Sequence, residues 1–129
     1  MQPKAFGRVL VVDDEGTILF AMGEFLSRIG FEVHTASERE EAEALLDQNG
    51  YVGLIADLRL LGSDSREGLE VIAAARERSR EIRIILLSAF ACAELDREAR
   101  LRGADAVLRK PRPLSEVAAC LVGLLKGPR

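Results

Sequence analysis

The chain has 129 residues, of which 48% are hydrophobic and 30% are charged, and its formal net charge is −3. This length suits one domain with a sizeable core, and the balanced composition excludes extended disorder. The acidic balance offers no basic stripe for nucleic acid, and no apolar run approaches the roughly 20 residues that cross a bilayer. We therefore expect one cytoplasmic domain over residues 1–129, without an output domain, that binds neither nucleic acid nor membrane.

Short apolar runs alternate with amphipathic stretches along the chain, which is the pattern of βαβ units around a parallel sheet. The first run, Val9–Val12, predicts a buried strand. Apolar residues then recur at helical spacing until Gly30, a residue type that commonly ends helices. Residues 32–35 predict a second, more polar strand, as expected nearer to the edge of a sheet.

A capping box is predicted at Ser37-Glu38-Arg39-Glu40, where the serine accepts a bond from the third residue's amide and Glu40 reaches back. This segment begins a second helix, which Asn49 and Gly50 end. The apolar run 52–56 predicts a third strand that ends in Asp57. A polar loop over residues 60–67 then leads into a third helix.

The remaining elements complete a prediction of five strands and five helices. The run 82–87 predicts a fourth strand, and Gly103 closes the fourth helix. The run 104–108 predicts a fifth strand, and residues 114–125 predict the last helix. Its apolar face is unusually wide, which indicates either dense packing or a docking surface for another chain, through Ala118, Ala119 and Val122.

Polar side chains follow four of these predicted strands. Asp13 and Asp14 follow the first, Asp57 the third, Ser88 the fourth and Lys110 the fifth. The carboxyl ends of parallel strands share one edge of a sheet, where open α/β sheets bind ligands. Clustered carboxylates recruit a cation, and Mg²⁺ prefers such hard oxygen ligands. The pattern predicts a site for a divalent cation and a phosphoryl group, with Asp57 as nucleophile.

Each of these residues also has a structural explanation on its own. An aspartate after a strand often caps the next helix, which alone would account for Asp13 or Asp14. Serine and Lys-Pro are common at strand ends and in loops. Their joint occurrence after four apolar strands of one chain favours a shared site.

In this ordered set of motifs the chain resembles the receiver domains of two-component response regulators, a family that includes chemotaxis regulators. The resemblance covers nearly the whole chain, and its matching segments are 9–15, Asp57–Leu60, Ser88–Ala89, Gly103–Asp105 and Lys110–Pro111. It implies a flavodoxin-like α/β fold, with a five-stranded parallel sheet in the order 2-1-3-4-5 and helices on both faces.

The resemblance also implies a magnesium site and a phosphoacceptor. Asp57 would accept the phosphoryl group and, with Asp14, ligate Mg²⁺ directly, with Mn²⁺ as an alternative ion. Asp13 would act through bound water, and the backbone carbonyl of Arg59 would complete the protein ligands. The protein would be a signalling switch that assists its own phosphorylation and dephosphorylation, and not an enzyme.

Further expectations from the family concern the switch and its partners. Ser88 would move to bond the phosphoryl group, Lys110 would pair with it, and the Lys110–Pro111 peptide would be cis. The donor would be a histidine kinase or a histidine phosphotransfer protein. An unidentified downstream protein, or a second copy in a homodimer, would bind the fourth helix, fifth strand and fifth helix.

The chain departs from the family pattern at three places. Val107 stands three positions before Lys110, where the family usually has an aromatic residue that reports the state of the switch. The loop from Asp57 to Gly68 is roughly three residues longer than usual, a change of little cost because loop-closure entropy grows slowly with length. Arg112 stands where phenylalanine is common.

Two other functions remain as alternatives. A receiver-fold interaction module that works without phosphorylation is suggested by Val107 and the longer loop. An aspartate-nucleophile phosphatase using Asp13 is suggested by Asp13-Asp14-Glu15-Gly16-Thr17, which is similar to the DxDGT motif of haloacid-dehalogenase-type enzymes. A nucleotide or flavin binder is disfavoured, because the acids after the first strand repel phosphate unless a cation intervenes.

The cysteines and the histidine carry no predicted chemistry. Cys92 and Cys120 lie in separate predicted helices without metal-ligand spacing, and we expect reduced thiols. The single histidine, His34, falls in the second predicted strand and is expected to be an ordinary strand residue and not a phosphoryl carrier.

Overall fold

The structure, a computed structural model, describes residues 6–58, 67–89 and 92–127. Within these ranges five strands alternate with five helices, as predicted. The strands are β1 (Gly7–Val12), β2 (Phe31–Ala36), β3 (Gly53–Asp57), β4 (Arg83–Ser88) and β5 (Ala106–Arg109). The helices are α1 (Gly16–Ile29), α2 (Arg39–Gln48), α3 (Glu67–Arg78), α4 (Ala93–Arg102) and α5 (Leu114–Lys126).

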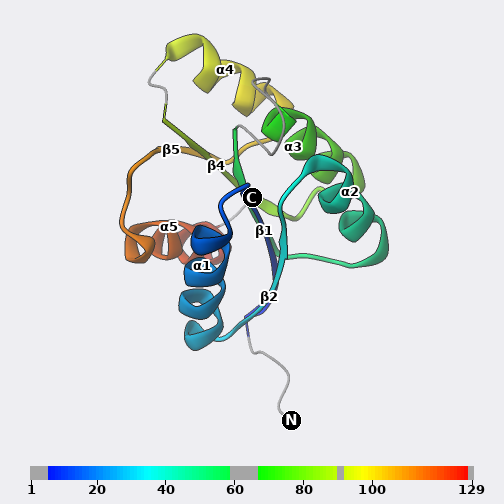
Figure 1. Cartoon of the computed structure of the whole chain (residues 1–129). Coiled ribbons are helices and arrows are strands. Elements are labelled where there is room, and N and C mark those ends of the chain that lie inside the picture. Colours follow the sequence, from blue (N-terminus) through cyan, green and yellow to red (C-terminus); the bar gives the residue numbers. More distant parts are fainter. Residues whose placement is uncertain (1–5, 59–66, 90–91, 128–129) are drawn as a thin grey trace.

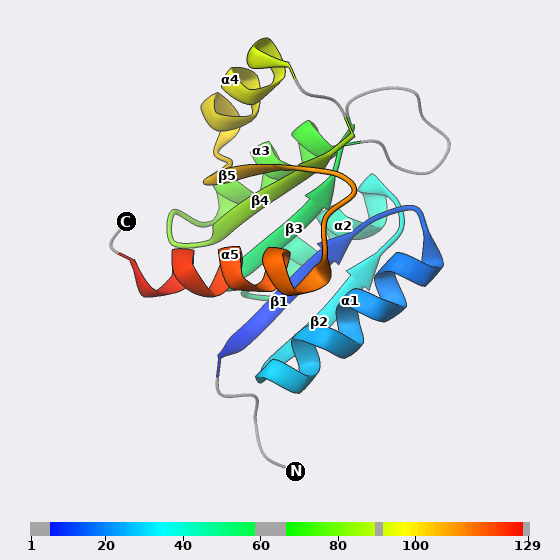
Figure 2. The ribbon, with the colours of Figure 1, turned by 90° about the vertical axis from the view of Figure 1, so that its left-hand side faces the viewer.

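All strand pairs are parallel, and the order across the sheet is β2-β1-β3-β4-β5. Helices α1 and α5 cover one face, and α2, α3 and α4 cover the other (Figures 1 and 2). The predicted fold class and strand order are therefore confirmed. None of the described helices is long and apolar enough to cross a membrane.

Alternation along the central strands divides the core into two layers. Val9 and Val11 of β1 pack with Met22 and Leu26 of α1, whereas Leu10 and Val12 face the α2–α3 side. Strands β3 and β4 are buried along their whole length, which explains why they read as continuous apolar runs. The edge strands β2 and β5 are only partly buried, as the polar sequence of β2 predicted.

The predicted capping box is wrong in both its serine and its glutamate, because Ser37 precedes the N-cap position and its hydroxyl donates to Glu41 Oε1 at 3.4 Å. Helix α2 begins at Arg39, and Glu38 is its N-cap residue. The side chain that reaches back to the Ser37 amide is Glu41, with 2.9 Å between Oε1 and N. The helix starts later than the box required, so the glutamate in reach is one position further along.

The structure also corrects part of the prediction about the wide apolar face of α5. Ala118 is buried, with 2% of its surface exposed, and packs in the core between α5 and the sheet. Ala119 is exposed and Val122 half-buried. The dense-packing interpretation therefore holds for Ala118, which drops out of any docking surface.

Two predictions about single residues can be compared directly with the structure. Cys92 is the N-cap residue of α4 and not part of that helix, and both Cys92 and Cys120 are free thiols. His34 lies in β2, as predicted, where Nδ1 is 2.8 Å from the Tyr51 hydroxyl and Nε2 is 2.9 Å from Glu32 Oε2.

Candidate functional site

The carboxyl ends of four neighbouring strands position the predicted site residues. Asp13 and Asp14 directly follow β1, and Asp57 is the last residue of β3. Ser88 is the last residue of β4 and is buried, and Lys110 follows β5. The backbone amide of Lys110 donates to the Ser88 carbonyl at 2.7 Å, which holds these two strand ends together.

Three carboxylates meet at this edge with one ammonium group. Asp13, Asp14 and Asp57 each offer an oxygen, and these oxygens lie within 4.8 Å of one another. Lys110 Nζ lies 3.3 Å from Asp57 Oδ1 and 3.5 Å from Asp13 Oδ2. The side chains that were predicted to meet at one edge of the parallel sheet therefore do lie close together.

Burial and like charges shift the protonation of this cluster. Burial, with the nearby Asp13 carboxylate as the next cause, raises the pKa of Asp57 to about 6, and the ammonium of Lys110 only partly offsets this. Burial likewise raises the pKa of Asp13. Burial acts against the charge of Lys110, but the carboxylates of Asp57 and Asp13 outweigh it, so the pKa of Lys110 is raised.

The donor set fits a hard divalent cation. Asp13 Oδ1 accepts a hydrogen bond from the Glu15 amide at 3.0 Å, at the start of α1. Asp13 Oδ2 is buried and accepts no hydrogen bond from any described residue. A buried carboxylate oxygen without a donor is costly unless a positive charge compensates it, and Lys110 is shared with Asp57. Carboxylate oxygens in this number are ligands suited to Mg²⁺.

Gly68, the glycine at the end of the loop that follows Asp57, is required for the position of Asp57. Gly68 is in the first turn of α3, and its amide donates to the Leu58 carbonyl at 2.9 Å. A β-carbon at Gly68 would lie 2.1 Å from the Asp57 carbonyl oxygen. Only glycine allows α3 to begin so close behind the end of β3. A glycine shortly after a strand-terminal aspartate was the available signal.

Two of the three departures from the family pattern, Val107 and Arg112, lie among the described residues. Val107 lies in β5, half-buried against the core on the α2–α4 side, and Arg112 forms an ion pair with Glu116 at 3.1 Å. The Lys110–Pro111 peptide is cis, as predicted. Arg59 and residues 60–66 of the longer loop lie outside the described residues.

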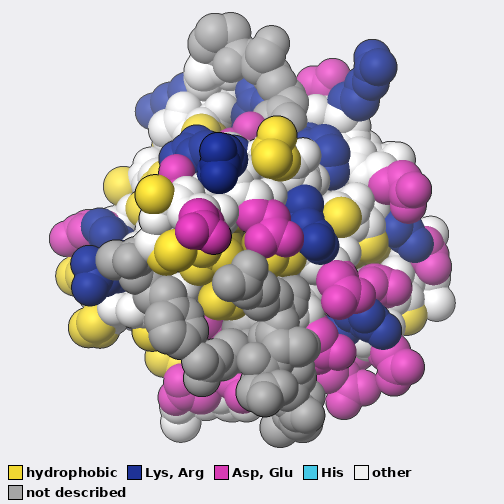
Figure 3. Space-filling view, turned by 90° about the horizontal axis from the view of Figure 1, so that it is seen from above, with side chains coloured by type: hydrophobic (Ala, Val, Ile, Leu, Met, Phe, Trp, Pro, Cys, Tyr) yellow, Lys and Arg dark blue, Asp and Glu magenta, His cyan; other side chains and the backbone are white. Residues whose placement is uncertain are grey.

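The surface over this end of the molecule is mixed in charge. In the view of Figure 3, acidic and basic side chains of the described residues lie interspersed.

Five parallel strands in this order, with helices on both faces, define the flavodoxin-like class of α/β proteins, and comparison with known proteins gives the family. Residues 9–121 match the family model described as response regulator receiver domain. The chain belongs to this family. It is a signalling domain, the receiver domain of two-component response regulators.

Relatives agree with this assignment. The alginate biosynthesis transcriptional regulatory protein AlgB of Pseudomonas aeruginosa is 37% identical over 105 residues, which cover 81% of this chain and 23% of AlgB. The transcriptional regulatory protein PrrA of Mycobacterium tuberculosis is 35% identical over 120 residues, which cover 92% of this chain and 50% of PrrA. The chain thus spans between about a quarter and a half of these relatives.

A solved structure resembles both the sequence and the fold. It is the crystal structure of a response regulator protein from Burkholderia pseudomallei with a phosphorylated aspartic acid, a calcium ion and citrate. It is 30% identical, superposes with a TM-score of 0.81, and the match covers 89% of this chain and 66% of that chain.

Proposed function

We propose that Asp57 accepts a phosphoryl group from a phosphohistidine of a histidine kinase or a histidine phosphotransfer protein, in a reaction that requires Mg²⁺. The observation that carries this proposal is the approach of Lys110 Nζ to Asp57 Oδ1, at 3.3 Å, beside three converging carboxylates. The phosphorylated aspartate and calcium ion of the Burkholderia pseudomallei protein support it by similarity.

The chain's own residues supply nucleophile, charge and position. A carboxylate oxygen of Asp57 would attack phosphorus, forming the P–O bond of an acyl phosphate while the P–N bond to the donor imidazole breaks. Lys110 stands where its ammonium would pair with the transferred oxygens. Ser88 ends the adjacent strand, and its hydroxyl would donate to one of them.

Asp13, Asp14 and Asp57, with the Arg59 carbonyl, would hold the cation, with Mn²⁺ as an alternative ion. When bound, such a cation neutralises carboxylate charge and polarises phosphoryl oxygens. Its binding would also lower the cost of ionising Asp57, whose pKa of about 6 otherwise keeps part of the population protonated near neutral pH. The chain would thereby assist its own phosphorylation.

Phosphorylation would act as a switch by favouring one of two conformations. Receiver domains of this family interact with histidine kinases, and we propose a downstream protein as second partner, bound through α4, β5 and α5. Because Val107 replaces the usual aromatic residue in β5, the readout of Ser88 would use other side chains. The cytoplasmic location and the absence of nucleic-acid binding stay predictions for the chain itself.

A small acyl-phosphate donor with Mg²⁺ tests the proposal. Intact-protein mass spectrometry should show the addition of one phosphoryl group, and peptide mapping should place it on Asp57. The Asp57→Asn variant should gain none, and chelation of the cation should prevent the gain in the unchanged chain. Label on Asp13, together with turnover of a simple phosphoester, would favour the phosphatase alternative.

The phosphorylation-independent module predicts a different result. Its test compares the affinity for a captured partner in the metal-free chain, in the chain with Mg²⁺ and beryllofluoride, and in the Asp57→Ala variant. A switch requires different affinities in the first two states. Equal affinity in all three would favour the module.

A further inference from the structure

Strand β2 forms an open edge of the sheet. Among the described strands it pairs only with β1, so its outer side presents backbone groups that no strand satisfies. Such edges are templates for pairing with another chain, and proteins usually blunt them with lysine, proline or a bulge. The six residues of β2, Phe31–Ala36, include neither lysine nor proline and keep unbroken register with β1.

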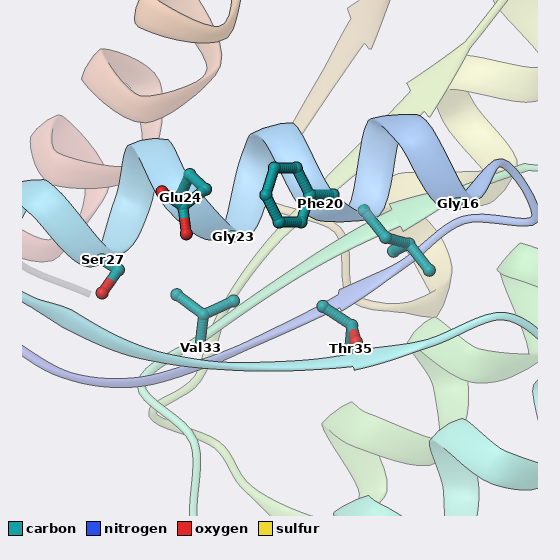
Figure 4. A pocket seen from close by; sticks show the side chains of 8 residues that line it. Gly16, Phe20, Gly23, Glu24, Ser27, Val33 and Thr35 are labelled. Atoms are coloured by element: carbon teal, nitrogen blue, oxygen red, sulfur yellow. The ribbon is translucent and has the colours of Figure 1, made fainter.

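A groove runs between this edge and α1. It has a volume of about 510 Å³, with Val33 and Thr35 on the strand side and the small residues Gly23 and Ser27 on the helix side (Figure 4). A β-carbon at Gly23 would meet only Val33 Cγ1, at 3.9 Å, so the groove has room for a side chain. Phe20 lines the groove, with 72% of its surface exposed.

We propose that this face binds the same face of a second copy of the chain, with the two β2 strands antiparallel about a twofold axis at Val33. The sheets would then form one continuous sheet, and the open backbone groups of each edge would pair. A twofold interface requires a surface that is complementary to itself. Strand β2 and the groove beside it meet this requirement through one polar pair of residues and one set of apolar contacts.

The polar match comes from Glu32 and His34, a carboxylate and an imidazole. An axis at Val33 sets Glu32 of each copy opposite His34 of the other, and residues directly opposite in a sheet point to the same face. Glu32 already contacts Arg8 and His34 of its own chain, each at 2.9 Å, and its side chain remains 45% exposed. An axis one half-step away, between Val33 and His34, would set Glu32 against Thr35 and lose both carboxylate–imidazole pairs.

The apolar match comes from Val33 and Phe20 on the other face. Val33 of one copy lies opposite Val33 of the other, and pairs of β-branched residues stabilise sheets. Figure 4 shows Phe20 above Thr35 at one end of the groove and Ser27 beyond Val33 at the other end. The twofold axis exchanges these ends, so Phe20 of each copy enters the other's groove beside Ser27.

Sedimentation equilibrium of the full chain and its variants tests this proposal. Phe20→Glu removes the aromatic side chain, and Gly23→Leu places a large side chain in the groove at a position where an added β-carbon meets only Val33 Cγ1, at 3.9 Å. Each should weaken dimerisation by about tenfold or more. The matched control is Leu101→Glu on α4, since Leu101 is also an exposed apolar residue, at 81%, on a different element. This control should leave the dimer unchanged, and circular dichroism should show all variants folded.

Cysteine cross-linking tests the position of the axis. In a chain with Cys92→Ser and Cys120→Ser, Val33→Cys should form an intermolecular disulfide, whereas Leu101→Cys should not. A chain that stays monomeric, or a dimer lost in Leu101→Glu but kept in Phe20→Glu and Gly23→Leu, would overturn the proposal. A dimer without the Val33→Cys cross-link would overturn it as well.

Discussion

At the scale of single residues, Asp57 is held in a place where its own charge is unfavourable. Its pKa of about 6, against an ordinary value of 3.8, arises mainly from burial and then from Asp13. The folded chain therefore holds a proton on Asp57 more tightly than the unfolded chain does. In the absence of metal, ionising Asp57 destabilises the fold, and this loss grows as pH rises from about 4 to about 6.

Asp57→Asn should consequently stabilise the metal-free chain at neutral pH. A shift from 3.8 to about 6 corresponds to an upper limit near 3 kcal/mol, and we expect a gain of about 1–3 kcal/mol at about pH 7. Below about pH 4 the gain should vanish, because Asp57 is then protonated in both states. Urea unfolding with a chelator, across this pH range, measures the difference.

Asp96→Asn provides the control, since this carboxylate pairs with Arg100 on the exposed side of α4. Exposed pairs contribute little, so its stability should change by less than about 0.5 kcal/mol. A gain in Asp57→Asn that did not depend on pH would contradict the electrostatic explanation.

At the scale of elements, helix α3 is positioned by the absence of a side chain at Gly68. Because an added β-carbon would lie 2.1 Å from the Asp57 carbonyl oxygen, Gly68→Ala must displace the start of α3 or the end of β3. We expect a loss of more than about 2 kcal/mol in unfolding free energy and slower phosphorylation of Asp57. Chemical denaturation and the phosphorylation rate measure the two effects.

Gly123→Ala in α5 is the matched control, because nothing lies within 4 Å of its added β-carbon. Removing a helical glycine at an open position should stabilise the chain by about 0.5–1 kcal/mol. Equal effects of the two substitutions would show that the contact with Asp57 is unimportant.

Arg83, the first residue of β4, binds the C-terminal end of α5. This buried guanidinium donates to the Leu124 carbonyl at 2.8 Å and to the Gly127 carbonyl at 3.0 Å, so it satisfies carbonyls at the end of the helix. Arg83→Met should destabilise the chain by about 1–3 kcal/mol and speed hydrogen exchange in the last turn of α5. Arg78→Met, which removes a surface pair with Asp47, should do neither.

These elements also show how far sequence reasoning reaches. The strands and their polar ends were predictable, because a buried parallel strand leaves a short apolar run and the chain order places Asp13, Asp57 and Lys110 at one edge. The roles of Gly68 and Arg83 were not, because each depends on a contact between segments far apart in sequence. Burial of Ala118 depends in the same way on how α5 is rotated against the sheet. The strand order itself came from the family resemblance.

At the scale of the whole molecule, the two helical layers hold the strand ends so that oxygens of three carboxylates lie within 4.8 Å of one another. The unfolded chain does not hold Asp57 close to Asp13 and Asp14, so the repulsion between Asp57 and these two carboxylates arises on folding. A cation that binds all three carboxylates relieves this repulsion. It therefore stabilises the folded state more than a cation bound to a single carboxylate would.

Mg²⁺ should raise the stability of the whole chain by mass action. At about 100 times its dissociation constant the gain is about 2.7 kcal/mol, provided that the unfolded chain does not bind the ion. The gain should shrink as pH falls through about 6, because protons then compete for Asp57. Thermal unfolding with and without Mg²⁺, at about pH 5 and about pH 8, measures it. Asp13→Asn should lose most of this response, since it removes a buried carboxylate charge from the cluster, and Asp96→Asn should retain it. A response equal in both variants would place the bound cation elsewhere on the molecule.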